Sequence, residues 1–382
     1  MGKVLLVTGA ARHLGGRFVR RIRREPGVEL VIGVDLQAPV PELVGPAEAS
    51  GPGEPHRAAY TFARADIRRP VVGRLLAEYA VDTVVHLGVS ATMLGSTSRS
   101  QVKETNVIGS MQLLGAVQKS PAVARLVVKS TTSVYGSAPR DPAVFHERMQ
   151  PKVLPTGGYA KDACEVEGYV RGFARRRPDV AVAVLRFANI IGPRADTPLA
   201  DYLSFPVLPT VLGYDPRMQF AHEDDVVEAV RLCALEARRG TTNAGTFNIA
   251  GDGVLLLSQI ARRLGRPTLP VAMPAVSVVG RLLRQTGLAD FSPEQLRLLT
   301  HGRVVDTTQM RETLGFVPSF STEQALDDFA RVRGTGLLDP ALLGRVVDRL
   351  AGGVRARESA AVGRAGAQRE RTGADSMGGL TR

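Results

Sequence analysis

The stretch from Val4 to Gly16 restricts the fold of this chain more than any other part of the sequence. An apolar run of strand length ends at Thr8 and Gly9, and a helical pattern of apolar residues begins at Leu14. A strand, a tight glycine turn and a helix in this order bring free backbone N–H groups and the positive end of the helix dipole together. The stretch therefore predicts a cradle for a pyrophosphate at the start of the helix.

Two features of this region indicate that the pyrophosphate belongs to a dinucleotide. Gly9 and Gly15 occupy the first and last glycine positions of the fingerprint G-x-x-G-x-x-G, although Arg12 stands at the middle one. Asp35 ends the next apolar run, 20 residues after Gly15, where a carboxylate that binds the adenosine ribose is expected. Because an acid there repels a 2′-phosphate, NAD is favoured over NADP as the cofactor. The alternative is an ordinary strand–helix turn followed by a solvated acid.

The composition is that of a soluble globular protein, with 382 residues of which 44% are hydrophobic and 23% charged. No apolar run reaches the length of a membrane span, and Met1 leads directly into the first strand, so we expect a cytoplasmic protein without a signal peptide or stable membrane insertion. Cys164 and Cys233 match no metal or redox spacing, so no metal is expected. The net charge is +12, but no nucleic-acid-binding motif accompanies it, so nucleic acid is not an expected partner.

Apolar runs alternate with helical patterns over the first 190 residues, which predicts a parallel sheet flanked by helices. The expected strands are 3–8, 29–34, 59–63, 82–87, 125–130 and 180–186, and the expected helices are 14–24, 70–80, 98–118 and 159–176. The fold class is therefore α/β, a Rossmann-type doubly wound parallel sheet with a smaller C-terminal substrate lobe. In such a sheet the ligand lies beyond the carboxyl ends of the strands.

The rest of the chain is less regular. Residues 1–190 are expected to form the NAD-binding domain, rejoined by about 216–250, whereas 191–215 and 250–335 form the smaller lobe and 351–382 a disordered tail. Helical patterns return at 224–237, 257–264, 275–286, 292–300 and 321–334, the fourth with Ser292 as its N-cap. Residues 38–57 contain five prolines and are predicted to be a surface loop.

Several short motifs follow one another at a recognisable spacing. They are Thr8–Gly15, Asp66-Ile67, His86-Leu87-Gly88, Asn106–Gly109, Ser130–Gly136, Leu185–Pro193 and His222–Asp225. With these motifs in this order, the chain resembles an extended short-chain dehydrogenase/reductase of the NAD-dependent epimerase/dehydratase family, similar to UDP-glucose 4-epimerase. The resemblance covers about residues 3–330.

The resemblance implies how the cofactor is bound. Asp66 and Ile67 would lie near the adenine, Leu87 to Val89 along the cofactor, and Asn106 would brace the site, although a helical Asn can equally bond a neighbouring backbone. The predicted cofactor-binding residues are Gly9, Arg12, His13, Leu14, Gly15, Asp35, Leu36, Asp66, Ile67, Leu87, Gly88, Val89, Asn106 and Tyr159.

The family's chemistry is hydride transfer to and from nicotinamide, with a Tyr as general base, a Ser or Thr hydroxyl beside it, and a Lys four residues after the Tyr. Free Tyr has a pKa near 10 and needs a nearby cation to act as a base at neutral pH. Here Thr131 and Tyr159 supply the hydroxyls, but Ala163 stands where the Lys is expected. A second register takes Lys161 as the catalytic Lys, but it leaves Gly157 in place of the Tyr. The Tyr-x-x-x-Lys motif is therefore degenerate.

Two basic residues could compensate for this loss. Lys129 ends a strand that should be buried and shares a side with Thr131, so we hypothesise that it supplies the missing cation near the nicotinamide or Tyr159. The alternative is that Lys129 reaches solvent or an acid. Arg12 either contacts the phosphates with its guanidinium or blocks the usual pose of the cofactor.

The substrate side also departs from the family. Asn189 stands where a sugar nucleotide would be held, and Arg217 lies one residue before the position of the family's diphosphate-binding Arg, which is Met218 here. The apolar segment 202–213 suits a small or hydrophobic ligand, a sugar nucleotide, or core packing. The leading prediction is an NAD-dependent nucleotide-sugar epimerase/dehydratase-like oxidoreductase. The alternative is a non-catalytic NAD(P)-binding sensor or assembly protein. A homodimer through helices 98–118 and 159–176 is expected by analogy.

Overall fold

The computed structural model describes residues 2–50, 55–91, 98–235, 242–274 and 293–334. The helix expected at 275–286, the cap at Ser292 and the tail 351–382 lie outside these described residues.

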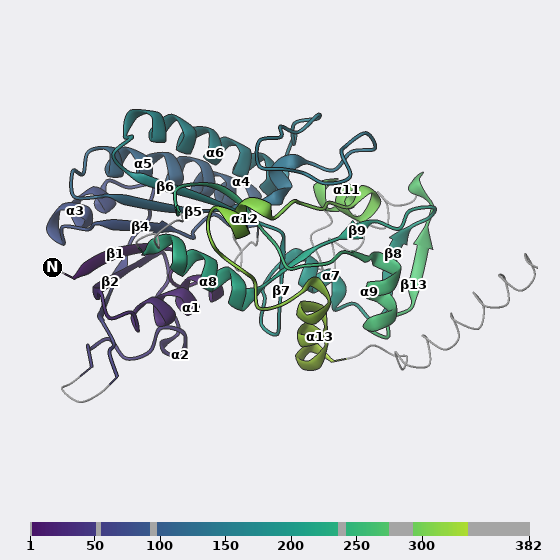
Figure 1. Ribbon diagram of the computed structural model, residues 1–382, viewed down its shortest axis with the longest axis horizontal. Helices are drawn as coiled ribbons and strands as arrows, with labels where there is room; N and C mark the ends of the chain where they lie inside the picture. The colour runs from purple at the N-terminus through teal and green to yellow at the C-terminus, as the bar shows by residue number, and fades with distance from the viewer. Residues whose placement is uncertain (1, 51–54, 92–97, 236–241, 275–292, 335–382) are drawn as a thin grey trace, which may run out of the picture.

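A seven-stranded sheet forms the centre of the molecule (Figure 1). Its strand order is β11-β6-β5-β4-β1-β2-β3, and every neighbouring pair is parallel. The strands are β1 (Lys3–Thr8), β2 (Val28–Asp35), β3 (Ala59–Arg64), β4 (Thr83–His86), β5 (Arg125–Thr131), β6 (Ala181–Phe187) and β11 (Gly245–Ile249). The chain runs outward from β1 to β3 and then returns to β4 on the other side of β1. This reversal opens a crevice beyond the carboxyl ends of β1 and β4, where ligands bind in such sheets.

Helices cover both faces of the sheet, because successive strand residues point to opposite sides. Leu5 and Val7 pack with α1 (His13–Ile22) and α8 (Glu223–Ala234) in one core, whereas Leu6 packs with the helices of the other face in a second core. The helices of that other face are α3 (Val71–Glu78), α5 (Ser110–Gln118) and α6 (Gly158–Arg176). The doubly wound Rossmann-type fold expected from the sequence is confirmed.

A second region with its own core lies beyond the sheet (Figure 1). Tyr202, Leu203, Leu208, Phe220 and Phe329 are among its fully buried residues, so the apolar segment 202–213 contributes to core packing. Its elements are β7 (Asn189–Ile191), α7 (Pro198–Leu203), β8 (Leu208–Val211), β9 (Arg217–Met218), β10 (Phe220–His222), β12 (Leu255–Leu256), α9 (Leu257–Arg263), β13 (Thr268–Val271), α11 (Pro293–His301) and α13 (Thr322–Arg333). The short helix α12 (Thr308–Glu312) packs on β11 of the sheet instead, with Met310 in the core of the sheet.

The structure modifies two of the expected elements. The helix predicted over 98–118 is α4 (Arg99–Glu104), a π-helical turn η1 (Thr105–Gly109) and α5, and the wide turn carries Asn106. Such turns often occur at functional sites. The proline-rich loop 38–57 contains the four-residue helix α2 (Pro41–Val44). Pro41 occupies its first turn, where a missing N–H costs nothing.

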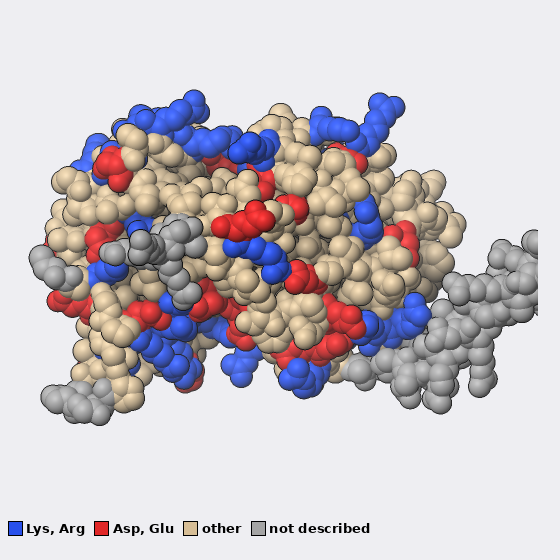
Figure 2. All heavy atoms as spheres, viewed as in Figure 1, with Lys and Arg blue, Asp and Glu red and all other residues tan. Residues whose placement is uncertain are grey.

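Charge is unevenly spread over the surface. On the face in Figure 2, Lys and Arg gather along the upper edge, over α5 and α6, while both signs are interleaved over the rest.

Candidate active site

Two glycines fix the turn between β1 and α1. Gly9 has a φ of +76°, a left-handed conformation that favours glycine, and a Cβ there would lie 2.9 Å from the backbone of Gly88. A Cβ on Gly15 would lie 2.0 Å from the carbonyl oxygen of Gly9. The first and last glycines of the fingerprint are thus required where β1, α1 and the loop after β4 meet. Arg12, at the middle position, has an extended backbone with φ −80° and ψ 155° that any residue can adopt.

Asp35 lies at the carboxyl end of β2, next to this turn. Its Oδ2 accepts a hydrogen bond from the backbone N–H of Ala11 at 3.1 Å, and its Oδ1 accepts one from the N–H of Leu36 at 2.8 Å. The carboxylate therefore braces the glycine turn as well as facing the pocket.

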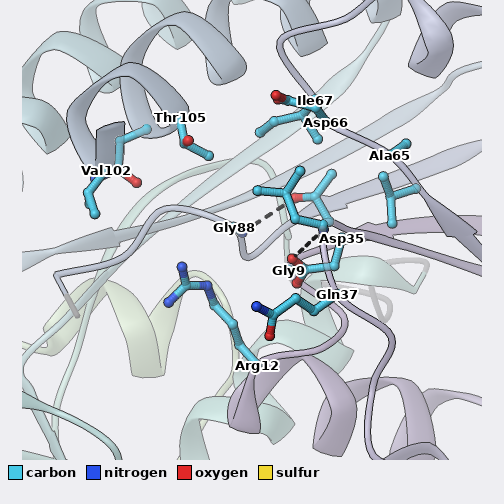
Figure 3. A pocket seen from close by; sticks show the side chains of 14 residues that line it. Gly9, Arg12, Asp35, Gln37, Ala65, Asp66, Ile67, Gly88, Val102 and Thr105 are labelled. Carbon is cyan, nitrogen blue, oxygen red and sulfur yellow. Dashed lines mark hydrogen bonds between the residues drawn. The ribbon is translucent and has the colours of Figure 1, made fainter. Parts of the chain in front are cut away.

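A pocket opens in front of the turn (Figure 3). Its lining contains eight of the predicted cofactor-binding residues: Gly9, Arg12, Asp35, Leu36, Asp66, Ile67, Gly88 and Asn106. It also contains residues that the sequence analysis missed, among them Gln37, Ala65, Val102 and Thr105. Gln37 lies two residues after β2 and Ala65 directly follows β3, so their positions just beyond strand ends could have suggested them.

The other predicted cofactor residues lie around this pocket without lining it. His13 Nε2 lies 3.3 Å from Glu223 Oε2, and Gly15 packs on the turn itself. Leu87 and Val89 are buried in the two cores. Leu14 and Tyr159 line a neighbouring cavity instead.

Asp66 is held by its own loop. Arg68 donates from Nε to both carboxylate oxygens, at 3.0 and 2.9 Å, and from Nη2 at 2.7 Å. These charge-assisted bonds hold the pKa of Asp66 below its usual value, so it is ionised at neutral pH. The side chain therefore has little hydrogen-bonding capacity left for a ligand.

A larger cavity of about 630 Å³ lies between the end of the sheet and the second core. Lys129 and Thr131 reach it from β5, Tyr159 from the start of α6, and Asn189 from β7. The structure thus brings together four of the five residues proposed for catalysis and substrate binding. The fifth, Arg217, is on the exposed side of β9, donates to the carbonyl of Ala143 at 3.2 Å and lines a separate pocket of about 150 Å³.

A family model described as the NAD dependent epimerase/dehydratase family matches residues 5–250, which is more than half of the chain. The chain belongs to the NAD-dependent epimerase/dehydratase family.

Relatives and solved structures agree with this assignment. An uncharacterized protein of Mycobacterium tuberculosis (strain ATCC 25618 / H37Rv) is 43% identical over 339 residues, which cover 88% of this chain and 86% of the relative. A probable UDP-arabinose 4-epimerase 3 of Oryza sativa subsp. japonica is 27% identical over 188 residues, 49% of this chain and 45% of the relative. The structure of a UDP-glucuronic acid 4-epimerase from Bacillus cereus, in complex with UDP-glucuronic acid and NAD, shares the fold with a TM-score of 0.64 at 19% identity, covering 86% of this chain and 98% of that chain.

The Tyr-x-x-x-Lys pattern of the epimerase/dehydratase family is incomplete in this structure, as the sequence indicated. Ala163 is 1% exposed and packs in the core, so it brings no charge to the cavity. Lys161 does not line the cavity. Glu167 has a structural role: it accepts from Ser130 Oγ at 2.6 Å and from Arg186 Nη2 at 2.6 Å.

The two titratable groups at the centre of the cavity are shifted in opposite directions. Burial, followed by the negative charges of Asp162 and Glu167, raises the pKa of Tyr159 above its usual value, and only Arg12 opposes this shift among the groups that act on it. Burial and the positive charge of Arg12 lower the pKa of Lys129 to about 8. The cavity therefore holds a neutral phenol and an amine that is only partly protonated slightly above neutral pH.

Asn106 connects the pocket to the cavity. Its Oδ1 accepts from the backbone N–H of Ser90 at 3.1 Å, and its Nδ2 donates to the carbonyl of Ser90 at 2.9 Å and to Asp162 Oδ2 at 3.0 Å. Asp162 also accepts a hydrogen bond from Arg99 Nη2 at 2.8 Å. Asn106 therefore bonds the backbone of Ser90 and fixes the loop between the pocket and the cavity, and its role toward the cofactor stays a prediction.

Proposed function

We propose that this chain is an NAD-dependent nucleotide-sugar epimerase/dehydratase-like oxidoreductase that works by transient hydride transfer to bound NAD. The main support is that the pocket at the glycine turn adjoins the larger cavity that contains Tyr159. Tyr159, Thr131, Lys129 and Asn189 line a cavity whose wall at Ser90 is bonded to Arg12 of the pocket at the glycine turn.

The residues around the first pocket fit a dinucleotide. Left-handed Gly9 and the start of α1 suit the pyrophosphate, Asp35 the adenosine ribose, and Ile67 the adenine. NAD, when bound, supplies a nicotinamide ring that accepts a hydride from the substrate carbon and returns it. Arg12, at the middle position of the fingerprint, contributes its side chain to the lining of this pocket.

The chain's own residues handle the proton and the substrate oxygen. The hydroxyl of Thr131 holds the reacting oxygen, and Tyr159 takes the proton of the substrate hydroxyl and gives it back. Lys129 supplies a positive charge on the same wall, and Asn189 contacts the sugar. Thr131 Oγ1 already accepts from the N–H of Ser133 at 3.1 Å, which orients the hydroxyl.

The test is a substrate screen with the state of the cofactor recorded. NAD-loaded protein is incubated with UDP-glucose, UDP-glucuronic acid, UDP-arabinose and dTDP-glucose while absorbance at the wavelength of reduced nicotinamide is followed and products are separated. We expect reduction or epimerisation with at least one sugar nucleotide and a loss of about 100-fold or more in Tyr159→Phe. Tyr214→Phe, at an exposed tyrosine that lines neither the pocket nor the cavity, is the control and should stay active.

The role of Lys129 has a test of its own. Lys129→Met should lower turnover, because it removes the charge on the cavity wall while keeping the length of the side chain. Unchanged turnover together with unchanged NAD affinity would exclude Lys129 from the reaction.

A second function follows from Ala163 and the raised pKa of Tyr159. The chain would then be a non-catalytic NAD-binding sensor or assembly protein that retains the scaffold. Bound NAD that no sugar nucleotide reduces, with Tyr159→Phe indistinguishable from the unmodified protein in every binding assay, would favour this alternative.

The protein's environment is also a proposal. None of the described helices is long and apolar enough to cross a membrane. We place the protein in the cytoplasm as a homodimer that pairs through α4, α5 and α6. Ile108, Met111 and Tyr169 on these elements are each about 40% exposed, which supports this face as the contact.

A further inference from the structure

The hydroxyl of Tyr159 opens into the large cavity and has no hydrogen-bond partner among the described residues. A phenol in such a position needs a cation before it can give up its proton at moderate pH. On its own helix the charges that act on its pKa are Asp162 and Glu167, both negative, whereas Lys161 does not line the cavity. The charged residues lining the same cavity from other elements are Arg99, Lys129, Asp196, Glu294 and Arg303.

The cations of the cavity lining are poorly suited to this task. Arg99 is paired with Asp162 at 2.8 Å. Arg303 donates to the carbonyl of Gly136 at 2.8 Å and to the hydroxyls of Ser133 and Ser137 at 3.0 Å each. Lys129 is free of such bonds among the described residues, but with its pKa lowered to about 8 it loses its charge as the pH rises toward the range where a phenol ionises.

Arg12 reaches the boundary of the cavity from the other side. Figure 3 shows its side chain extending from the glycine turn toward the loop that carries Gly88. Its Nη1 donates to Ser90 Oγ at 2.8 Å, and Ser90 itself lines the cavity that contains Tyr159. Among the described residues no acceptor holds the other N–H groups of this guanidinium. Burial lowers the pKa of Arg12 from its usual value, but a guanidinium begins so far above neutrality that it keeps its charge where an amine with a pKa of about 8 loses it.

The loop that receives Arg12 is fixed relative to the Tyr159 helix. Asn106 binds both backbone groups of Ser90 and, through its amide, Asp162, which lies three residues after Tyr159. The guanidinium is therefore held in a fixed place between the dinucleotide pocket and the phenol.

We infer that Arg12 is a positioning residue that stabilises the ionised form of Tyr159, in place of the lysine that is absent at position 163. The inference rests on the proposed role of Tyr159 as the base. It explains two departures from the family together: the arginine in the glycine fingerprint and the alanine in the tyrosine motif.

The ionisation of residue 159 can be measured without any substrate. A fluorinated tyrosine, whose phenol titrates at lower pH than that of tyrosine, is incorporated at position 159 of the full-length protein at saturating NAD, and ¹⁹F NMR follows its titration. We expect Arg12→Met to raise the midpoint by about one pH unit or more, and Arg12→Lys to raise it less. Lys129→Met, which removes a cation of the same cavity, is the matched control and should move the midpoint by a smaller amount.

Each outcome decides the question. A midpoint that Arg12→Met and Arg12→Gly leave in place would overturn the inference, and so would a larger shift in Lys129→Met than in Arg12→Met. A weaker affinity for NAD in Arg12→Met without movement of the midpoint would make Arg12 a phosphate ligand only. If Arg12→Met misfolds, Arg12→Lys and Arg12→Gly carry the comparison.

The same titration separates this inference from the proposed reaction. If the midpoint depends on Arg12 but no sugar nucleotide is turned over, the pairing of Arg12 with Tyr159 stands and the reaction falls. If turnover is found, its pH profile in Arg12→Met should move to higher pH by the shift measured with the fluorinated tyrosine.

Discussion

Gly15 has the least room of the glycines in the pocket turn. A Cβ at this position would lie 2.0 Å from the carbonyl oxygen of Gly9, whereas a Cβ on Gly115 of α5 would meet nothing within 4 Å. We expect Gly15→Ala to lose about 2 kcal/mol or more of stability and to abolish NAD binding, because the turn must move. Gly115→Ala should gain about 0.5–1 kcal/mol, since alanine is the better helix former. Urea unfolding and calorimetric NAD titration of both variants check the contrast.

Lys129 gives a pH dependence whose sign follows from its lowered pKa. The amine binds its proton less tightly in the folded state, with a pKa of about 8, than in the unfolded state, with a pKa of 10.5. The charged amine therefore lowers the free energy of unfolding by its full amount below about pH 8, and this loss disappears between pH 8 and 10.5. We expect Lys129→Met to be about 1–3 kcal/mol more stable than the unmodified protein at pH 7, with the difference closing by about pH 10.5. Unfolding of the NAD-free proteins in urea at pH 7 and 10 measures this. A difference that is the same at both pH values would contradict the assignment.

The sequence predicted the position of a residue where the backbone conformation or the end of a strand determines which residue types fit. Gly9 and Asp35 were found because a left-handed turn and a strand end leave few choices of residue. The destination of Arg12 was not predictable, because its partner Ser90 lies 78 residues away and a long side chain can turn several ways. Arg217 was expected beside the substrate, but β9 pairs antiparallel with β12, and its side chain reaches Ala143 instead.

At the scale of elements, α6 is fixed to the sheet by a buried ion pair. Glu167 on α6 accepts hydrogen bonds from Arg186 of β6, from Nε at 2.9 Å and from Nη2 at 2.6 Å. Arg186 also donates to the hydroxyl of Tyr135 at 2.8 Å. Arg186→Met should cost about 3–5 kcal/mol, because it leaves a buried carboxylate uncompensated. The double variant Glu167→Met with Arg186→Met should recover a large part of that loss. Denaturant unfolding of the single and double variants tests this, and additive losses would show that the pair does not act as one unit.

The long elements were predicted well and the short ones were not. Strands such as β1 and helices such as α6 carry enough apolar residues for their period to be recognised. The second region uses strands of two to four residues, among them β9 and β12, which are too short to show any period. The π-helical turn at Asn106 was also hidden, because its apolar spacing differs little from that of the helices on either side.

At the scale of the whole molecule, we propose the helical layer formed by α5 and α6 as the contact with a second copy. The two helices lie side by side on the outside of the sheet (Figure 1). We expect Met111→Lys to convert the proposed dimer to a monomer, since it places a charge among the exposed apolar residues of this layer. Val317→Lys alters a more exposed apolar residue elsewhere, 64% against 42% exposed, and should leave the assembly intact. Light scattering after size-exclusion chromatography measures both.

The path of the chain also limits how this molecule can be cut. The seventh strand of the sheet, β11, is contributed only after the polypeptide has passed through β7 to β10 of the second region, and it pairs with the outer edge of β6. In a fragment truncated near residue 190, β6 would be an exposed edge strand with unpaired backbone groups, which could pair with a strand of another copy. During synthesis, the first six strands leave the ribosome well before β11, which pairs with the edge of β6. The sheet that carries the cofactor pocket is thus completed only after the chain has formed β7 to β10 of the second region, and before the remaining elements of that region are made.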